Sequence, residues 1–209
     1  MSHRRAINHL RNSDPKLAAV IDSVGKCTFE PASDMPHFTA ITRSIVYQQL
    51  SGKAASTIYG RFAALFDDET PAAHSLLDIP DEKLRGAGLS RQKIGYLRDL
   101  AARVHAGDVP IDSLHELSDD DIITALTSVK GIGRWTAQMF LMFRLGRPDV
   151  LPDLDLGIQK GIQRAYNMRK LPSPKRVLEV GAKWAPYRTI ASWYLWRSLD
   201  AKAENRQGD

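Results

Sequence analysis

Residues 126–143 read LTSVKGIGRWTAQMFLMF, and this is the most informative segment of the chain. Helical apolar periodicity on both sides is interrupted by the Gly-Ile-Gly turn at 131–133. Glycines permit positive φ and leave the backbone N–H groups of the turn uncovered, so a phosphate can approach them at a helix N-terminus. Lys130 and Arg134 flank the turn with positive charge. The stretch predicts a helix–hairpin–helix that grips DNA by its backbone without reading sequence.

An ordinary helical hairpin is the alternative interpretation of the same turn. In that case Gly131 and Gly133 only reverse the chain, and Ile132 fills the core. A Gly-x-Gly turn considered alone favours this simpler interpretation. DNA binding is favoured only if the surrounding segments support it.

The second informative segment is LPDLDLGIQKG at 151–161, which contains Asp153 and Asp155. Asp155 stands just before an expected helix, where backbone N–H groups hold a carboxylate and keep it ionised near neutral pH. As a helix N-cap it would contribute about 1 kcal/mol to stability. A cap also fixes a carboxylate in space, so the structural and the catalytic role are compatible.

Helical periodicity dominates the rest of the chain and strand-like alternation is nearly absent, so the predicted fold class is all-α. Ser118 and the three acids after it are typical of a capping box. Ser90 can cap the helix that follows it, Gly107 can end that helix, and Pro174 suits a first helical turn. The expected helices cover residues 15–24, 37–50, 52–66, 81–87, 91–106, 119–127, 134–145, 156–166, 173–183 and 186–199.

Charge is unevenly distributed along the 209 residues, whose formal net charge is +5. Residues 157–197 contain nine basic side chains and one acid, Glu179, whereas residues 107–121 contain six acids and no Lys or Arg. A basic run is usually a solvated face, and it indicates nucleic acid only when a specific motif accompanies it.

The single cysteine and the absence of several sequence motifs exclude disulfides and some metal and cofactor sites. A single cysteine, Cys27, allows no internal disulfide, four-cysteine iron–sulfur cluster or paired-cysteine zinc site. HExxH, PCxxC, P-loop and Rossmann glycine patterns are absent, so zinc hydrolases, zinc base deaminases and nucleotide cofactors are not indicated. No apolar run resembles a secretory signal or a membrane span, so we expect no membrane partner and a cytoplasmic, nucleoid-associated protein, or a nuclear one in a eukaryote.

Taken together, the segments resemble the helix–hairpin–helix DNA glycosylase superfamily, specifically its DNA-3-methyladenine glycosylase II branch. The resemblance spans roughly residues 37–197. It rests on VKGIGRWTAQMF at 129–140, LPDLDLGIQKG at 151–161, IVYQQLS at 45–51, GLSRQK at 88–93 and WAPYRTIASWYLW at 184–196. Joined motifs in this order are far more specific than a lone Gly-x-Gly.

The resemblance implies that Asp155 is the catalytic aspartate. Asp153 stays open as a competitor, because both are followed three residues later by an aliphatic side chain. Superfamily members that also cleave the DNA backbone carry a lysine at position 135, whose amine attacks C1′. Trp135 offers no amine, so water is the expected nucleophile and an abasic site the expected product.

Further roles follow from the resemblance. A cationic lesion such as 3-methyladenine would be held by electron-rich rings, and a side chain would fill the gap that the flipped base leaves. A monovalent cation, Na⁺ or K⁺, can be held by hairpin carbonyls, and no other cofactor is expected. The candidates are Trp135, Tyr187 and Trp196 for the base pocket; Gln49 or Leu50 for the wedge; Lys130, Gly131, Gly133, Arg134 and Thr136 for phosphates; and the carbonyls of Thr127, Val129 and Ile132 for the cation.

The expected protein is therefore a monomeric base-excision repair enzyme acting on damaged double-stranded DNA. It would consist of two helical lobes with an interlobe cleft: residues 37–147 with the wedge and the hairpin, and residues 1–36 with 148–209 carrying Asp155. Two alternatives stay open: a glycosylase for deaminated or etheno purines, and a noncatalytic helix–hairpin–helix DNA-binding module.

Overall fold

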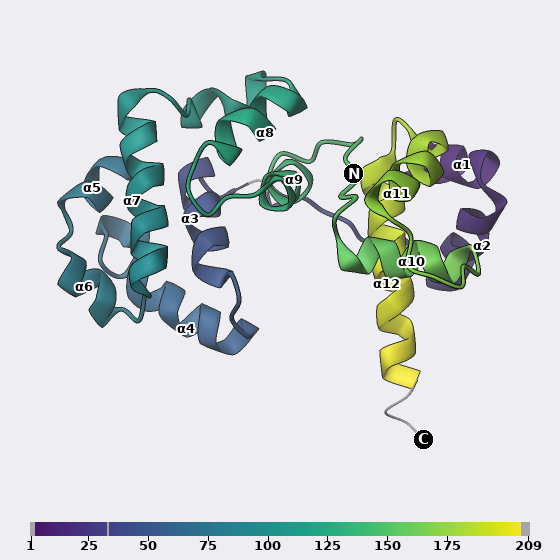
Figure 1. Cartoon of the computed structure of the whole chain (residues 1–209), viewed down its shortest axis with the longest axis horizontal. Helices are drawn as coiled ribbons and strands as arrows, with labels where there is room; N and C mark the ends of the chain where they lie inside the picture. The colour runs from purple at the N-terminus through teal and green to yellow at the C-terminus, as the bar shows by residue number, and fades with distance from the viewer. Residues whose placement is uncertain (1–2, 33, 206–209) are drawn as a thin grey trace. The chain divides into compact units, whose positions relative to one another are not determined.

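The computed structural model describes residues 3–32 and 34–205, and within these ranges the regular secondary structure is entirely helical (Figure 1). The predicted all-α fold class is therefore confirmed. Among the described helices, none combines the length and apolar character that crossing a bilayer requires.

The chain divides into two compact units. The terminal unit comprises Met1–Pro31 and Leu141–Asp209, and the central unit is Ala32–Phe140. The sequence analysis places these boundaries at 36/37 and 147/148. The later boundary falls earlier in the structure because Phe143 packs against Phe29 and Trp196 of the terminal unit.

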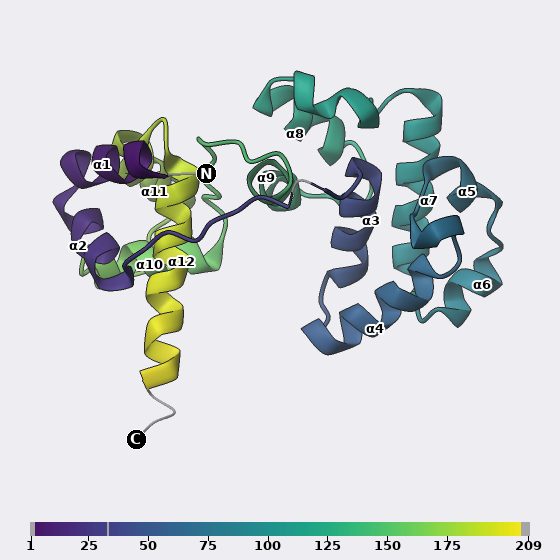
Figure 2. The ribbon, with the colours of Figure 1, turned by 180° about the vertical axis from the view of Figure 1, so that it is seen from behind.

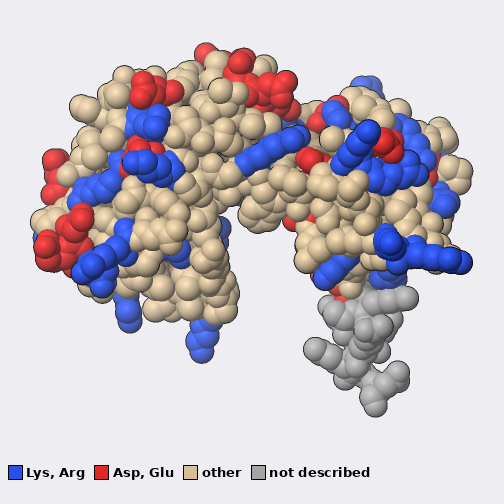
Figure 3. Space-filling model, in the orientation of Figure 1, with Lys and Arg blue, Asp and Glu red and all other residues tan. Residues whose placement is uncertain are grey.

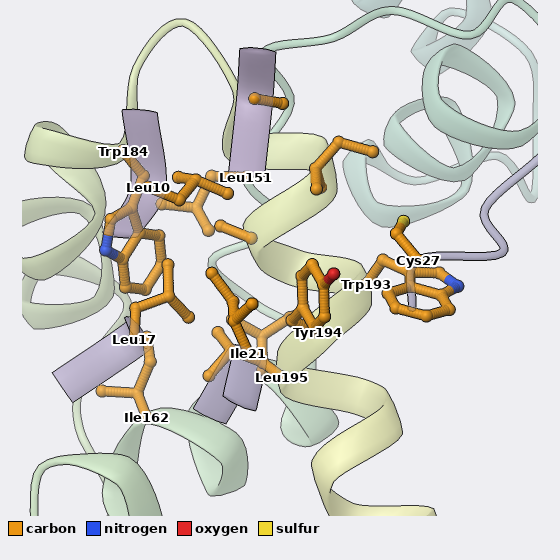
Figure 4. Packing of buried hydrophobic residues seen from close by; sticks show 14 of the residues in the cluster. Leu10, Leu17, Ile21, Cys27, Leu151, Ile162, Trp184, Trp193, Tyr194 and Leu195 are labelled. Atoms are coloured by element: carbon orange, nitrogen blue, oxygen red, sulfur yellow. The ribbon is translucent and has the colours of Figure 1, made fainter. Parts of the chain in front are cut away.

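The terminal unit is built around α12, which packs against α10 and α2 (Figure 2). Gly161 permits a close crossing of α10 and α12, since a Cβ there would lie 2.9 Å from Leu195 Cβ. Trp184, Tyr194 and Leu195 are buried among aliphatic side chains of the first two helices, as Figure 4 shows. Its helices are α1 (Arg4–Ser13), α2 (Pro15–Val24), α10 (Leu156–Ala165), α11 (Pro174–Gly181), η3 (Ala182–Trp184) and α12 (Arg188–Asn205).

Asp14 ties the N-terminal helices to the rest of the terminal unit. It is the N-cap of α2, accepting from the backbone N–H groups of Lys16 and Leu17, and its side chain is fully buried. The indole of Trp184 donates to it over 2.8 Å, and the Tyr166 hydroxyl and the Lys183 ammonium complete the cluster. We call this set the Asp14 corner.

The central unit is organised by α7, which runs between α3 and the pair α5 and α6 (Figures 1 and 2). Arg98 on α7 donates to the carbonyls of Leu76 and Ile79 and pairs with Asp81, which fixes the corner between α5 and α6. The unit contains α3 (His37–Tyr47), α4 (Gly52–Ala63), η1 (Asp67–Glu69), α5 (Ala73–Asp78), α6 (Asp81–Gly86), α7 (Arg91–Ala106), η2 (Ile111–Glu116), α8 (Asp119–Thr127) and most of α9 (Arg134–Phe143).

Local capping signals act as the sequence predicts. Ser90 accepts from the Lys93 amide, and Gly107 ends α7 in the left-handed conformation. Ser118 accepts from the Asp121 amide and donates to its carboxylate, and Pro174 opens α11. These boundaries follow from chemistry within three residues of the helix end.

Other boundaries were predicted wrongly. The helix expected over 37–50 ends at Tyr47, because Gln48 is extended and Gln49 adopts a positive φ of 58°. The helix expected over 52–66 ends at Ala63, and α12 continues to Asn205 rather than 199. Helices α1 and α5 were not predicted at all: α1 has no side-chain cap and α5 spans only six residues.

Candidate functional site

The hairpin between α8 and α9 presents its polar residues outward. Lys130, Gly131, Gly133 and Arg134 are exposed, whereas Ile132 is buried. The turn is closed by backbone hydrogen bonds, among them one from the Ile132 amide to the Val129 carbonyl over 3.1 Å. Core filling by Ile132 and outward presentation of the glycines therefore occur together.

The two hairpin glycines differ in what surrounds them. Gly131 has a φ of +81°, and a Cβ there would lie 2.2 Å from Cδ2 of Tyr96, so the fold itself requires a glycine. A Cβ on Gly133 would meet nothing within 4 Å. Gly133 is therefore the glycine beside which a phosphate has room to approach.

Asp99 on α7 anchors the start of the hairpin. Its carboxylate accepts from the Lys130 amide over 2.8 Å and from Nε of Arg103 over 3.0 Å. Burial alone would raise the pKa of Asp99, but these donors outweigh it and the pKa lies below its usual value. Asp99 was not predicted from the sequence, because nothing local to a mid-helix aspartate signals a contact with a turn far along the chain.

The loop at 48–51, which we call the wedge loop, connects α3 to α4 next to the hairpin. Gln49 is exposed, and Leu50 is exposed over 37% of its surface. The side-chain amide of Gln48 donates to the Gly131 carbonyl over 2.9 Å, so the loop and the hairpin are joined directly. Lys93 on α7 also reaches the loop, donating to the Gln48 carbonyl over 2.8 Å.

A hollow of about 580 Å³ lies beside this junction within the central unit. It brings together the predicted wedge residue Gln49, the predicted phosphate contacts Gly131 and Thr136, and Trp135, which was predicted for the base pocket. Trp135 is 44% exposed, which is unusual for an indole in a helical protein. The lining residues are Ser44, Tyr47, Gln48, Gln49, Gln92, Lys93, Tyr96, Gly131, Trp135 and Thr136.

Asp155 lies on the terminal unit as the N-cap of α10. Its Oδ1 accepts from the Ile158 amide and from the indole nitrogen of Trp196, both over 2.8 Å. A Cβ on Gly157 would lie 2.8 Å from Cδ1 of Trp196 and 2.9 Å from Oδ1 of Asp155. Gly157 thus makes room for the contact between indole and carboxylate, a role that the sequence analysis did not recognise.

The competitor, Asp153, occupies a different environment. It is only 3% exposed, and its carbonyl accepts from the Gln159 side chain. Asp155 is half-buried, and its neighbours Leu154 and Leu156 expose more than half of their surface. Of the two carboxylates, Asp155 is the more accessible to solvent and to a ligand.

Aromatic rings extend from Trp196 across the terminal unit. Trp196 stacks on Phe143 with centroids 5.8 Å apart, and Phe143 lies 5.7 Å from Phe29. A hollow of about 270 Å³ beside them is lined by Thr28, Phe29, Glu30, Phe143, Trp193, Trp196, Arg197 and Asp200. Phe29 and Phe143 were missed from the sequence, although both lie beside a residue predicted for the base pocket.

Of the three aromatic residues predicted for the base pocket, Trp196 and Tyr187 belong to the terminal unit and Trp135 to the central unit. Trp196 contacts Asp155, and Trp135 lines the hollow of the central unit. Tyr187 packs against the core of the terminal unit, and its ring meets His9 edge-on at 5.4 Å.

Charge on each unit follows the sequence pattern. Acidic side chains gather over α8 in Figure 3, where they serve the N-terminus of that helix. Lys and Arg side chains spread over the terminal unit, and the basic residues between 157 and 197 are exposed apart from Arg188, which pairs with Asp149 over 2.7 Å. Within the described residues, no group of three or more His, Cys, Asp or Glu side chains could hold a metal ion.

Comparisons with known proteins agree on one family. The family described as HhH-GPD superfamily base excision DNA repair protein matches residues 42–186. DNA-3-methyladenine glycosylase 1 of Schizosaccharomyces pombe is 34% identical over 91% of this chain and 85% of its own length.

Solved structures give the same result. The Bacillus halodurans structure titled DNA-3-methyladenine glycosidase superposes with a TM-score of 0.86 at 38% identity, covering 95% of this chain and 91% of that one. The 3-methyladenine DNA glycosylase of Schizosaccharomyces pombe, solved in complex with abasic DNA, has a TM-score of 0.79 at 34% identity, covering 92% and 95%.

Proposed function

Because the chain belongs to the HhH-GPD superfamily of base excision DNA repair proteins, we propose that it is a monofunctional DNA glycosylase that removes alkylated bases of the 3-methyladenine type. The names of its relatives from Schizosaccharomyces pombe and Bacillus halodurans support this substrate class. The partner is double-stranded DNA containing a damaged base, which is flipped out of the stack for cleavage.

The observation that carries the proposal is the setting of Asp155. A half-exposed carboxylate has one oxygen fixed by the Ile158 amide and the Trp196 indole, with two exposed leucines beside it. Fixed carboxylates stabilise the positive charge that develops on a sugar as its glycosidic bond breaks. The same contacts also cap α10, so the cap holds the reacting group in place.

The proposed reaction needs few groups. A 3-methylated adenine already carries positive charge, so the electron pair of the N-glycosidic bond leaves with the base without protonation. Water then attacks C1′ and gives its proton to Asp155, leaving an abasic site. Trp135 stands where a lysine would supply an amine, so no covalent step to the protein is proposed.

DNA binding is assigned to the hairpin. Lys130, Gly133 and Arg134 are exposed, and Gly133 leaves room for a phosphate at the start of α9. Monovalent cation binding by the carbonyls of Thr127, Val129 and Ile132 stays a prediction. It is compatible with the turn, because the Val129 carbonyl accepts one hydrogen bond and has a second lone pair.

Asp155→Asn tests the proposal. Asparagine keeps the shape and one oxygen acceptor but removes the negative charge, so release of methylated bases from alkylated DNA should fall about a thousandfold, with abasic-site binding retained. Freed bases are separated by chromatography. Asp22→Asn, at an exposed position on α2, is the matched control and should release bases at the unaltered rate.

Two outcomes would contradict the proposal. Full turnover by Asp155→Asn would remove the reacting role from this residue. DNA binding by the unaltered chain without any freed base would favour the noncatalytic module, in which Asp155 only caps α10. Release of hypoxanthine or etheno adenine in preference to methylated bases would favour the alternative lesion class.

A further inference from the structure

We propose that Lys93 is a positioning residue, which holds the wedge loop in its projecting conformation and in register with the hairpin. The proposal rests on the function proposed above, since it gives the loop a role in filling the gap left by a flipped base. Nothing in the sequence analysis assigned Lys93 a role beyond its place in the GLSRQK segment.

The Lys93 side chain reaches from α7 to the end of α3. It lies in the first turn of α7, is half-buried, and donates to the carbonyls of Val46 over 2.6 Å and Gln48 over 2.8 Å. Carbonyls at a helix C-terminus lack partners within the helix and carry partial negative charge. The ammonium therefore binds the end of α3 and the first residue of the loop together.

This contact supports an unusual backbone conformation in the wedge loop. Gln49 has a φ of +58°, a region that side chains with a Cβ disfavour. Such a conformation persists only when its surroundings hold it. Gln48, immediately before it, is held at both ends: its carbonyl by Lys93 and its side-chain amide by the Gly131 carbonyl over 2.9 Å.

The Lys93 ammonium is engaged by the protein itself, which distinguishes it from a lysine that binds phosphate. An ammonium has three donor hydrogens, and two of those on Lys93 are directed at backbone carbonyls. Partial burial also lowers the pKa of Lys93. Lys130 provides the contrast: its side chain is 75% exposed on the hairpin, as expected of a phosphate contact.

The experiment compares Lys93→Met, Lys130→Met and the control Lys83→Met in the full chain. Methionine keeps the unbranched stem and removes the ammonium, and Lys83 is an exposed residue of α6. Affinity is measured for an undamaged duplex and for the same duplex with one abasic site, over a range of salt concentrations. The abasic duplex already contains the gap that a positioned wedge fills.

Lys93→Met should weaken abasic-site binding about tenfold, change undamaged-duplex binding less than twofold, and keep the unaltered salt slope. Lys130→Met should weaken both duplexes alike and reduce the slope of log K against log salt by about 0.9. Lys83→Met should change neither. Gln48→Leu, which breaks only the link to Gly131, should cause a smaller loss that is again confined to the abasic duplex.

Equal losses on both duplexes, or a slope reduced as in Lys130→Met, would overturn the inference and make Lys93 a phosphate contact. Unchanged abasic-site binding in Lys93→Met would also overturn the inference. If Lys93→Met does not fold, unchanged abasic-site binding in Gln48→Leu would overturn it instead. Base release by the unaltered chain is measured separately. A chain that prefers abasic DNA but frees no base would reject the glycosylase and leave the positioning role standing.

Discussion

Two aspartates of the terminal unit, Asp14 and Asp155, have nearly the same local chemistry and opposite surroundings. Each caps a helix by accepting an amide three residues ahead, and each accepts an indole N–H over 2.8 Å. Asp14 is fully buried and receives a hydroxyl and an ammonium as well. Asp155 is half-exposed beside Gly157 and two exposed leucines.

A capped carboxylate is therefore not in itself a functional signal. What separates the two is access. The donors around Asp14 come from three segments of the fold, namely the start of α2, the end of α10 and η3, and they shield it from solvent, so it holds the structure together. The donors of Asp155 that fix one oxygen leave the residue partly open to solvent, which is the access that its proposed reacting role requires.

The largest expected effect is a separation of activity from stability at Asp155. Asp155→Asn should raise the activation free energy of base release by about 4 kcal/mol. It should lower the free energy of unfolding by only about 1 kcal/mol. Urea denaturation beside the rate assay measures both quantities. If the free energy of unfolding fell by as much as the activation free energy rose, Asp155 would be a structural residue like Asp14.

Asp14→Asn should show the reverse. Removing the charge from a buried cluster that contains the Lys183 ammonium should cost about 3 kcal/mol in the free energy of unfolding, while base release per folded molecule stays within twofold. Asp22→Asn on the same helix is the control for stability. A loss of base-release rate without a loss of stability would contradict the distinction between Asp14 as a structural residue and Asp155 as the reacting one.

Gly157→Ala should produce a smaller effect on activity. The added methyl would lie 2.8 Å from Cδ1 of Trp196, so the indole must move away from Asp155. We expect base release to fall about tenfold with kcat changing more than KM, and tryptophan fluorescence to change because the Trp196 indole loses its acceptor. Gly95→Ala on α7, where a Cβ would meet nothing, is the control.

The smallest effect is on the pH dependence of stability. Burial raises the pKa of Asp14, but the hydrogen bonds from Tyr166, Trp184, Leu17 and Lys183 outweigh it, and the net pKa is lowered. A lowered folded-state pKa stabilises the fold above the unfolded value of about 3.8, and this contribution is lost as pH falls through the folded value. Thermal unfolding between pH 5 and about pH 2 should therefore lose less stability in Asp14→Asn than in the unaltered chain. Equal losses would show that the Asp14 corner is not linked to pH.

The sequence predicted those features whose causes are local. The all-α class, the hairpin turn, and the caps at Ser90 and Ser118 each depend on a few consecutive residues. The N-cap position of Asp155 was predicted the same way, from its place before a helix, and is confirmed, while its catalytic role is a proposal. Of its two hydrogen bonds, the one from the Ile158 amide could be predicted from the sequence. The one from Trp196 could not, because it joins α10 to α12.

The features that were missed depend on contacts between distant segments. Phe29 and Phe143 meet only in the folded terminal unit, and Asp99 reaches Lys130 from another helix. The end of α3 at Tyr47 was missed for the same reason: Lys93 stabilises the carbonyls there from α7. The apolar periodicity of a single helix does not indicate which residues of other helices contact it.

The exposure of Trp135 has an optical consequence. Of the four tryptophans, Trp184 and Trp193 are buried and Trp196 is partly so, which leaves Trp135 with the largest solvent contact. An indole in water emits at longer wavelength than one in a core, so the red edge of the protein's emission belongs mainly to Trp135. Light collected there should dim when a duplex covers the hairpin, and the chain thus carries its own reporter of binding, with no dye attached.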